Sequence, residues 1–94
     1  ELKTLVDKLK EISEKIILFG SCSIVEDNYE SDIDLLVLTN EKEKVNKKII
    51  NTKLNRKIQA VVVNTVDLMK IKEKDKAFYQ EINKGITLWD VKNE

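Results

Sequence analysis

The chain is poor in several residue types, and each shortage narrows what the protein can be. Cys22 is its one cysteine, so no disulfide can form within the chain, and no histidine exists to activate that thiol. No proline and no linker divides the sequence, so the 94 residues are expected to form one domain, residues 1–94. No apolar run approaches the roughly 20 residues of a membrane span, and a cytoplasmic protein without a membrane partner is expected.

Excess charge of either sign is also absent. Lys and Arg number 17 and Asp and Glu number 17, and Arg56 is the single arginine. A duplex DNA binder usually carries a basic excess, because neutralising phosphates supplies much of its affinity. The balance therefore argues against duplex DNA as a partner. Together, 41% hydrophobic and 36% charged residues indicate a compact core beneath a charged surface.

The spacing of apolar residues predicts helices and strands in alternation, which is typical of an α/β layer structure. Apolar residues recur at helical spacing from Leu2 to Ile12. Short apolar runs predict strands at 16–19, 32–38, 56–63 and 86–89. The strand at 32–38 is apolar on both faces beyond its first residues, so it is expected to be covered on both sides.

Capping patterns predict two further helices. Asn40 followed by Glu43 has the form of an N-cap, and that helix should run to about residue 52 with Val45, Ile49 and Ile50 turned inward. Asn64 or Thr65 can cap a last helix that carries Asp67 in its first turn and ends at Gly85 as the C′ residue. One face of this helix should hold Leu68, Ile71, Phe78 and Ile82.

Asp32 and Asp34 are the first candidates for chemistry. They lie two residues apart on an expected strand, so their side chains should point to the same face. Two carboxylates held in this way can share Mg²⁺, which prefers oxygen ligands and keeps waters or phosphates in its other positions. Two ordinary solvated acids at a strand start remain the alternative.

Gly20 and Ser21 add a second candidate feature. A glycine after a buried strand lets backbone N–H groups approach an anion closely, and the serine hydroxyl adds another donor. The alternative is a turn that only leaves the strand.

The combination is more specific than either part. Gly20-Ser21, ten intervening residues and then Asp32-Ile33-Asp34 before an apolar strand form the stretch FGSCSIVEDNYESDIDLLVLT. This stretch resembles the signature of the DNA polymerase beta-type nucleotidyltransferase superfamily, and most of all its smallest members, the minimal nucleotidyltransferases. Ser31 belongs to the same pattern. The resemblance implies the nucleotidyltransferase fold, an α/β (α+β) domain with a small mixed sheet of three to four strands flanked by helices.

The resemblance also implies a mechanism. Gly20, Ser21 and Ser31 would hold a nucleoside triphosphate, and Asp32 and Asp34 would hold Mg²⁺ or Mn²⁺. A third carboxylate on the next strand would complete the metal site and help to deprotonate an attacking hydroxyl. A nucleoside monophosphate would then pass to that hydroxyl, and pyrophosphate would leave.

Two departures from the family pattern bear on catalysis. The position of the third carboxylate holds Gln59, whose neutral amide is a poorer Mg²⁺ ligand and cannot act as a base. Many relatives follow Gly-Ser with a small residue, an arginine and a glycine, where this chain has Ser23, Ile24 and Val25. A catalytically degenerate domain that binds nucleotide or a partner is therefore the alternative to an active enzyme.

The chain is too short to include a separate acceptor domain. The hydroxyl acceptor is therefore expected on a partner chain or on a second copy in a homo-oligomer. The resemblance implies a small all-helical protein as that partner, in a toxin–antitoxin pair.

Overall fold

A computed structural model gives the structure of residues 2–20, 33–52 and 57–93. These residues form four α-helices and a four-stranded sheet. In chain order the elements are α1 (Leu2–Leu9), β1 (Lys15–Phe19), β2 (Ile33–Leu38), α2 (Lys42–Asn51), β3 (Ile58–Val63), α3 (Thr65–Lys74), α4 (Lys76–Asn83) and β4 (Ile86–Asp90), with single 3₁₀ turns at Lys10–Ile12 and Val91–Asn93.

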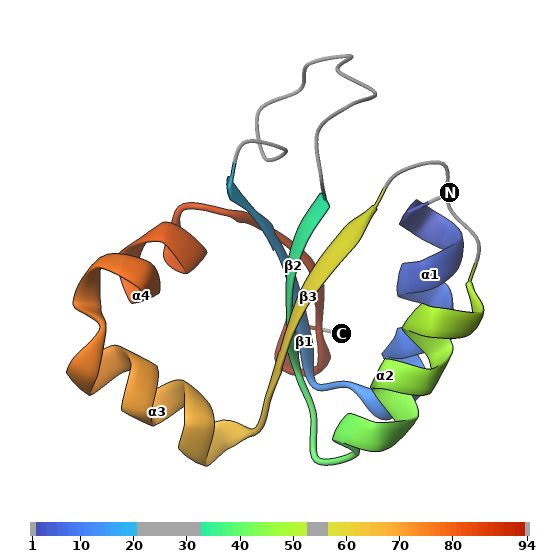
Figure 1. Cartoon of the computed structure of the whole chain (residues 1–94), viewed down its shortest axis with the longest axis horizontal. Coiled ribbons are helices and arrows are strands. Elements are labelled where there is room, and N and C mark those ends of the chain that lie inside the picture. The colour runs from blue at the N-terminus through green and yellow to red at the C-terminus, as the bar shows by residue number, and fades with distance from the viewer. Residues whose placement is uncertain (1, 21–32, 53–56, 94) are drawn as a thin grey trace.

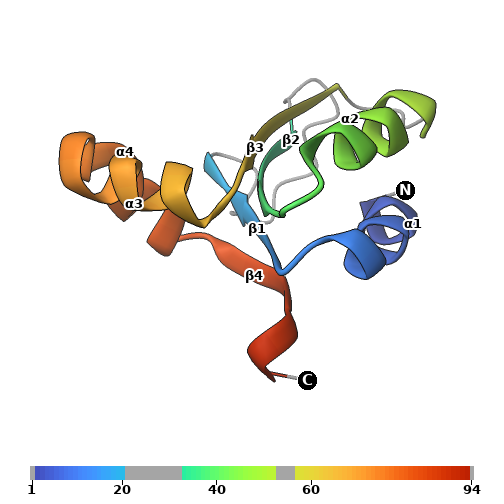
Figure 2. The same cartoon turned by 90° about the horizontal axis from the view of Figure 1, so that it is seen from below.

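The sheet is mixed, and its strand order is β3-β2-β1-β4. β1 pairs antiparallel with both β2 and β4, whereas β2 and β3 run parallel. Helices α1 and α2 cover one face of the sheet, and α3 and α4 cover the other (Figure 1). The view from below shows the same separation (Figure 2). The expected α/β fold with a small mixed sheet is confirmed.

A hydrophobic core lies on each side of the sheet because the central strands are apolar on both faces. In β2, Leu35 and Val37 point toward α1 and α2, and Leu36 points toward α3 and α4. All three side chains are fully buried. The expectation that this strand is covered on both faces is confirmed.

The start of α2 differs from the sequence prediction. Asn40 is not its N-cap, because the helix begins at Lys42 and its cap residue, Glu41, makes no side-chain capping bond. Instead, the buried Thr39 hydroxyl accepts a hydrogen bond from the Glu41 N–H at 2.9 Å and donates one to the Ile12 carbonyl. Ile50 was predicted to point inward and is 79% exposed, because only the opposite side of α2 meets the sheet.

The last predicted helix is two helices in the structure. Asn64 and Asp67 form the predicted capping box at the start of α3. The helix then ends at Lys74, and the Asp75 carboxylate caps α4 by accepting from the Phe78 N–H at 3.1 Å. The break lets both helices turn apolar side chains into one core, which includes Leu68, Ile71, Phe78 and Ile82 as predicted.

Gly85 follows α4 as predicted, but a left-handed backbone is not what requires glycine there, since its φ is not positive. A Cβ at this position would overlap the Leu18 carbonyl oxygen and lie 2.9 Å from Cγ2 of Ile17. The close approach of the chain to β1 therefore requires a residue without a side chain.

Candidate functional site

Asp34 lies at the beginning of β2, where two neighbouring strands place other residues beside it. It is paired with Phe19 across the antiparallel β1–β2 ladder and with Gln59 across the parallel β2–β3 ladder. Laterally paired residues share a face of the sheet, and Asp34, two residues before Leu36 on the same strand, shares with it the face toward α3 and α4. The side chains of Asp34 and Gln59 are therefore neighbours on that face. Asp34 is half-buried, and Gln59 is exposed.

Gly20 brings the chain after β1 against the same carboxylate. Its φ is +75°, in the left-handed region that disfavours residues with a Cβ. A Cβ on Gly20 would overlap Oδ2 of Asp34 and lie 3.3 Å from its Cγ. Glycine is thus required here both by its backbone conformation and by the closeness of the Asp34 carboxylate.

The structure therefore brings together three of the residues selected from the sequence, namely Gly20, Asp34 and Gln59. The other three selected residues lie outside the described part of the chain: Ser21, Ser31 and Asp32. Within the described residues, no group of three Asp, Glu, Cys or His side chains has a spacing that could hold a metal ion. The donor set that the structure describes is the Asp34 carboxylate beside the Gln59 amide, and oxygen donors of this kind suit Mg²⁺.

Asp67, the acidic residue in the first turn of α3, lies at the opposite end of the sheet. It follows the last residue of β3, and Asn64, its capping partner, lies five residues beyond Gln59, roughly 16 Å along a strand. Its carboxylate accepts hydrogen bonds from the Lys42 ammonium and from the Asn64 N–H. Mainly because of the bond from Lys42, the pKa of Asp67 is lowered from its ordinary value of 3.8. Asp67 thus stabilises the start of α3 and is not the missing third carboxylate.

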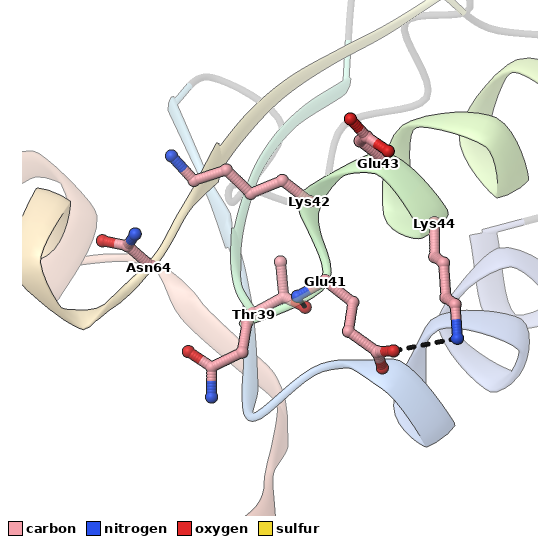
Figure 3. A pocket seen from close by; sticks show the side chains of 7 residues that line it. Thr39, Glu41, Lys42, Glu43, Lys44 and Asn64 are labelled. Atoms are coloured by element: carbon pink, nitrogen blue, oxygen red, sulfur yellow. Dashed lines mark hydrogen bonds and ion pairs between the residues drawn. The ribbon is translucent and has the colours of Figure 1, made fainter.

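A cavity of about 460 Å³ lies at this second end of the sheet, and the sequence interpretation missed it. The first turn of α2 forms much of its wall, and Glu41 pairs there with Lys44 at 2.9 Å (Figure 3). The sequence signal that could have indicated this cavity is a polar residue directly after each of the two parallel strands, Thr39 after β2 and Asn64 after β3. The cavity is lined by Thr39, Asn40, Glu41, Lys42, Glu43, Lys44 and Asn64.

No helix within residues 2–20, 33–52 and 57–93 is long and apolar enough to cross a membrane.

Helices on both faces of a small mixed sheet, with an acidic residue at the head of the central strand against a glycine turn, are consistent with a nucleotidyltransferase domain. The model of the family described as polymerase beta, nucleotidyltransferase, matches residues 1–94. The chain belongs to this family, which assigns nucleotidyl transfer to it in general terms. Searches of the curated proteins and of the solved structures gave no match.

Proposed function

We propose that the chain is a minimal nucleotidyltransferase domain that binds a nucleoside triphosphate with Mg²⁺ or Mn²⁺ and transfers a nucleoside monophosphate to a hydroxyl acceptor. The observation that supports this best is the close approach of Gly20 to Asp34, with Gln59 beside it on the next strand. Three residues far apart in the sequence meet at one end of the sheet, in a chain that belongs to a nucleotidyltransferase family.

Each residue has a proposed task that follows from its chemistry. Asp34, together with Asp32, would hold the metal ion, and Ser21, Ser31 and the Gly20 backbone would hold the triphosphate. When bound, the metal would neutralise phosphate charge and favour in-line displacement at the phosphoryl group. Gly20 keeps the backbone close to the carboxylate, because a larger residue would force that carboxylate to turn away.

Gln59 supports a second candidate function, a nucleotide-binding or partner-binding domain without catalysis. It lies next to Asp34, in the position where a third carboxylate would be needed, and its amide cannot accept a proton from an attacking hydroxyl. Such a domain would keep metal-dependent nucleotide binding and lack transfer. In either case we propose that the acceptor or partner is a separate chain, for which the family resemblance suggests a small all-helical protein.

Binding is tested by calorimetry with Mg²⁺ and a nucleoside triphosphate. Asp34→Asn should lower the affinity for the Mg²⁺–triphosphate complex by tenfold or more, roughly 1.4 kcal/mol. Asp7→Asn is the matched control, because Asp7 is an exposed acid on α1 that pairs with Lys10 of the same segment at 3.3 Å. Equal affinities for both variants and the wild type would rule out a metal site at Asp34.

Gln59→Asp separates the enzyme from the binder. A third carboxylate beside Asp34 adds like charge without metal, so thermal stability of this variant should depend on Mg²⁺ more than that of the wild type. Transfer of a labelled nucleotide to the protein or to a helical partner should also increase. If melting of Gln59→Asp is indifferent to Mg²⁺, Gln59 does not belong to the site.

A further inference from the structure

Among the strands of the described residues, β3 is an edge strand, with β2 as its one neighbour in the sheet. Two bonds define which residues point toward β2: the Lys57 carbonyl accepts from the Ile33 N–H at 2.9 Å, and the Val63 carbonyl accepts from the Thr39 N–H at 2.8 Å. Backbone groups alternate along a strand, so residues 57, 59, 61 and 63 address β2. The N–H and C=O groups of Ile58, Ala60 and Val62 therefore point away from the sheet.

This edge lacks the features by which proteins block edge strands. Residues 58–63 include no charged residue and no proline, and their register with β2 continues without a bulge through every pair. The other edge strand, β4, has a register shift against β1 and ends on the charged Asp90. Among the described strands, β3 thus presents the apolar edge without a bulge, and its residues Ile58, Ala60, Val61 and Val62 are only half-buried.

We propose that β3 joins two copies of this chain in an antiparallel pair about a two-fold axis through Ala60. This interface goes beyond the proposed function and does not depend on it. In this register Ala60 opposes Ala60 of the second copy, and Ile58 opposes Val62 of the second copy. The Ala60–Ala60 pair and the two Ile58–Val62 pairs then have their N–H and C=O groups directed at the other strand, so each of these pairs exchanges both hydrogen bonds.

A second copy of the chain is the occupant that fits this edge, because it brings an equally apolar strand without charge or proline. Ile58, Ala60 and Val62 are spaced symmetrically about Ala60, so the edge is complementary to itself, as a two-fold interface requires. Charge agrees with this, because Lys57 would oppose Val63 and no two like charges would face one another. Gln59 would lie opposite Val61 of the second copy, so the interface would run beside the proposed nucleotide site of each copy.

The first test measures mass by light scattering as a function of concentration. The wild type should reach the mass of two chains by about 100 µM. Val62→Pro should remain a monomer, because it removes an outward N–H and leaves the β2–β3 hydrogen bonds in place. A wild type that stays monomeric, or a folded Val62→Pro that still dimerises, would overturn the proposal.

The second test does not require the proline variant to fold. In a Cys22→Ser background, Ala60→Cys should form a disulfide-linked dimer on mild oxidation, since opposed Cα atoms lie about 5.5 Å apart. Val61→Cys is the matched control, because the two copies of residue 61 lie diagonally, roughly 8 Å apart, and should not cross-link. No cross-link through residue 60, or a stronger one through residue 61, would refute the register.

Discussion

Replacing Gly20 by alanine tests whether the turn after β1 is fitted to the Asp34 carboxylate. The variant places a Cβ on a residue with φ of +75°, which costs about 1–2 kcal/mol. The same Cβ overlaps Oδ2 of Asp34, so the carboxylate has to rotate away from its present rotamer at a cost of about 0.5–1.5 kcal/mol. We expect Gly20→Ala to lose roughly 2–3 kcal/mol of unfolding free energy, which lowers Tm by roughly 10–20 °C in a domain of this size.

A double-mutant cycle separates the two costs. Asp34→Ala removes the atoms that the new Cβ meets but leaves the backbone conformation of residue 20 unchanged. In that background, Gly20→Ala should cost only the backbone share, about 1–2 kcal/mol. Urea unfolding of the wild type, both single variants and the double variant gives the coupling directly.

Gly85→Ala is the control for this cycle. Its Cβ would meet the Leu18 carbonyl oxygen, which belongs to the backbone, and Asp34 is not among the atoms that it would touch. The cost of Gly85→Ala should therefore be the same with and without Asp34→Ala. If Gly20→Ala costs less than about 0.5 kcal/mol, or if its cost is independent of Asp34, the proposed fit between turn and carboxylate is wrong.

Three further predictions concern stability. Asp67→Asn should lower the free energy of unfolding near neutral pH. Because the pKa of Asp67 is lowered in the folded state, its stabilising effect is complete above the ordinary value of 3.8 and is lost as pH falls through the folded pKa. Below about pH 4, the free energy of unfolding measured in urea should therefore fall less steeply with pH in this variant than in the wild type. Leu36→Ala should lose about 2–5 kcal/mol because the side chain is fully buried, whereas the exposed Ile50→Ala should stay within about 0.5 kcal/mol in the same assay. Thr39→Val should lose about 1–3 kcal/mol of unfolding free energy, since the Glu41 N–H and the Ile12 carbonyl lose their buried partner, and an unchanged Tm would contradict this.

The sequence alone determined the order of helices and strands, apart from the break between α3 and α4, and pointed to one end of the sheet. Short apolar runs predicted β1 and β2 because both faces of these strands are buried. The pattern from Gly20 to Asp34 indicated the polymerase beta-type nucleotidyltransferase family, whose family model matches residues 1–94. The capping box of Asn64 and Asp67 was also readable, because both partners lie within one turn of helix. Each of these features depends on neighbours in the chain.

Tertiary structure decided the features that depend on distant residues. The α2 N-cap prediction at Asn40 was wrong because Thr39, held by Ile12 across the fold, bonds the Glu41 N–H instead. The requirement for Gly85 comes from the approach of Leu18, which is far away in the sequence. Asp67 is an acid like Asp34, but it lies beyond the far end of β3 from Gln59.

The position of Gln59 beside Asp34 shows the same division. The family resemblance singled out Gln59 as the residue at the position of the third carboxylate, but only the parallel pairing of β2 with β3 puts it next to the Asp34 carboxylate. A parallel pair needs a crossover, here through α2, and a shift of one residue in register would have turned the Gln59 side chain to the opposite face. Register is strongly specified where the faces of a strand are buried, and both faces of β2 are buried here. The local sequence thus named the residues of the site, and the pairing of distant strands brought them together.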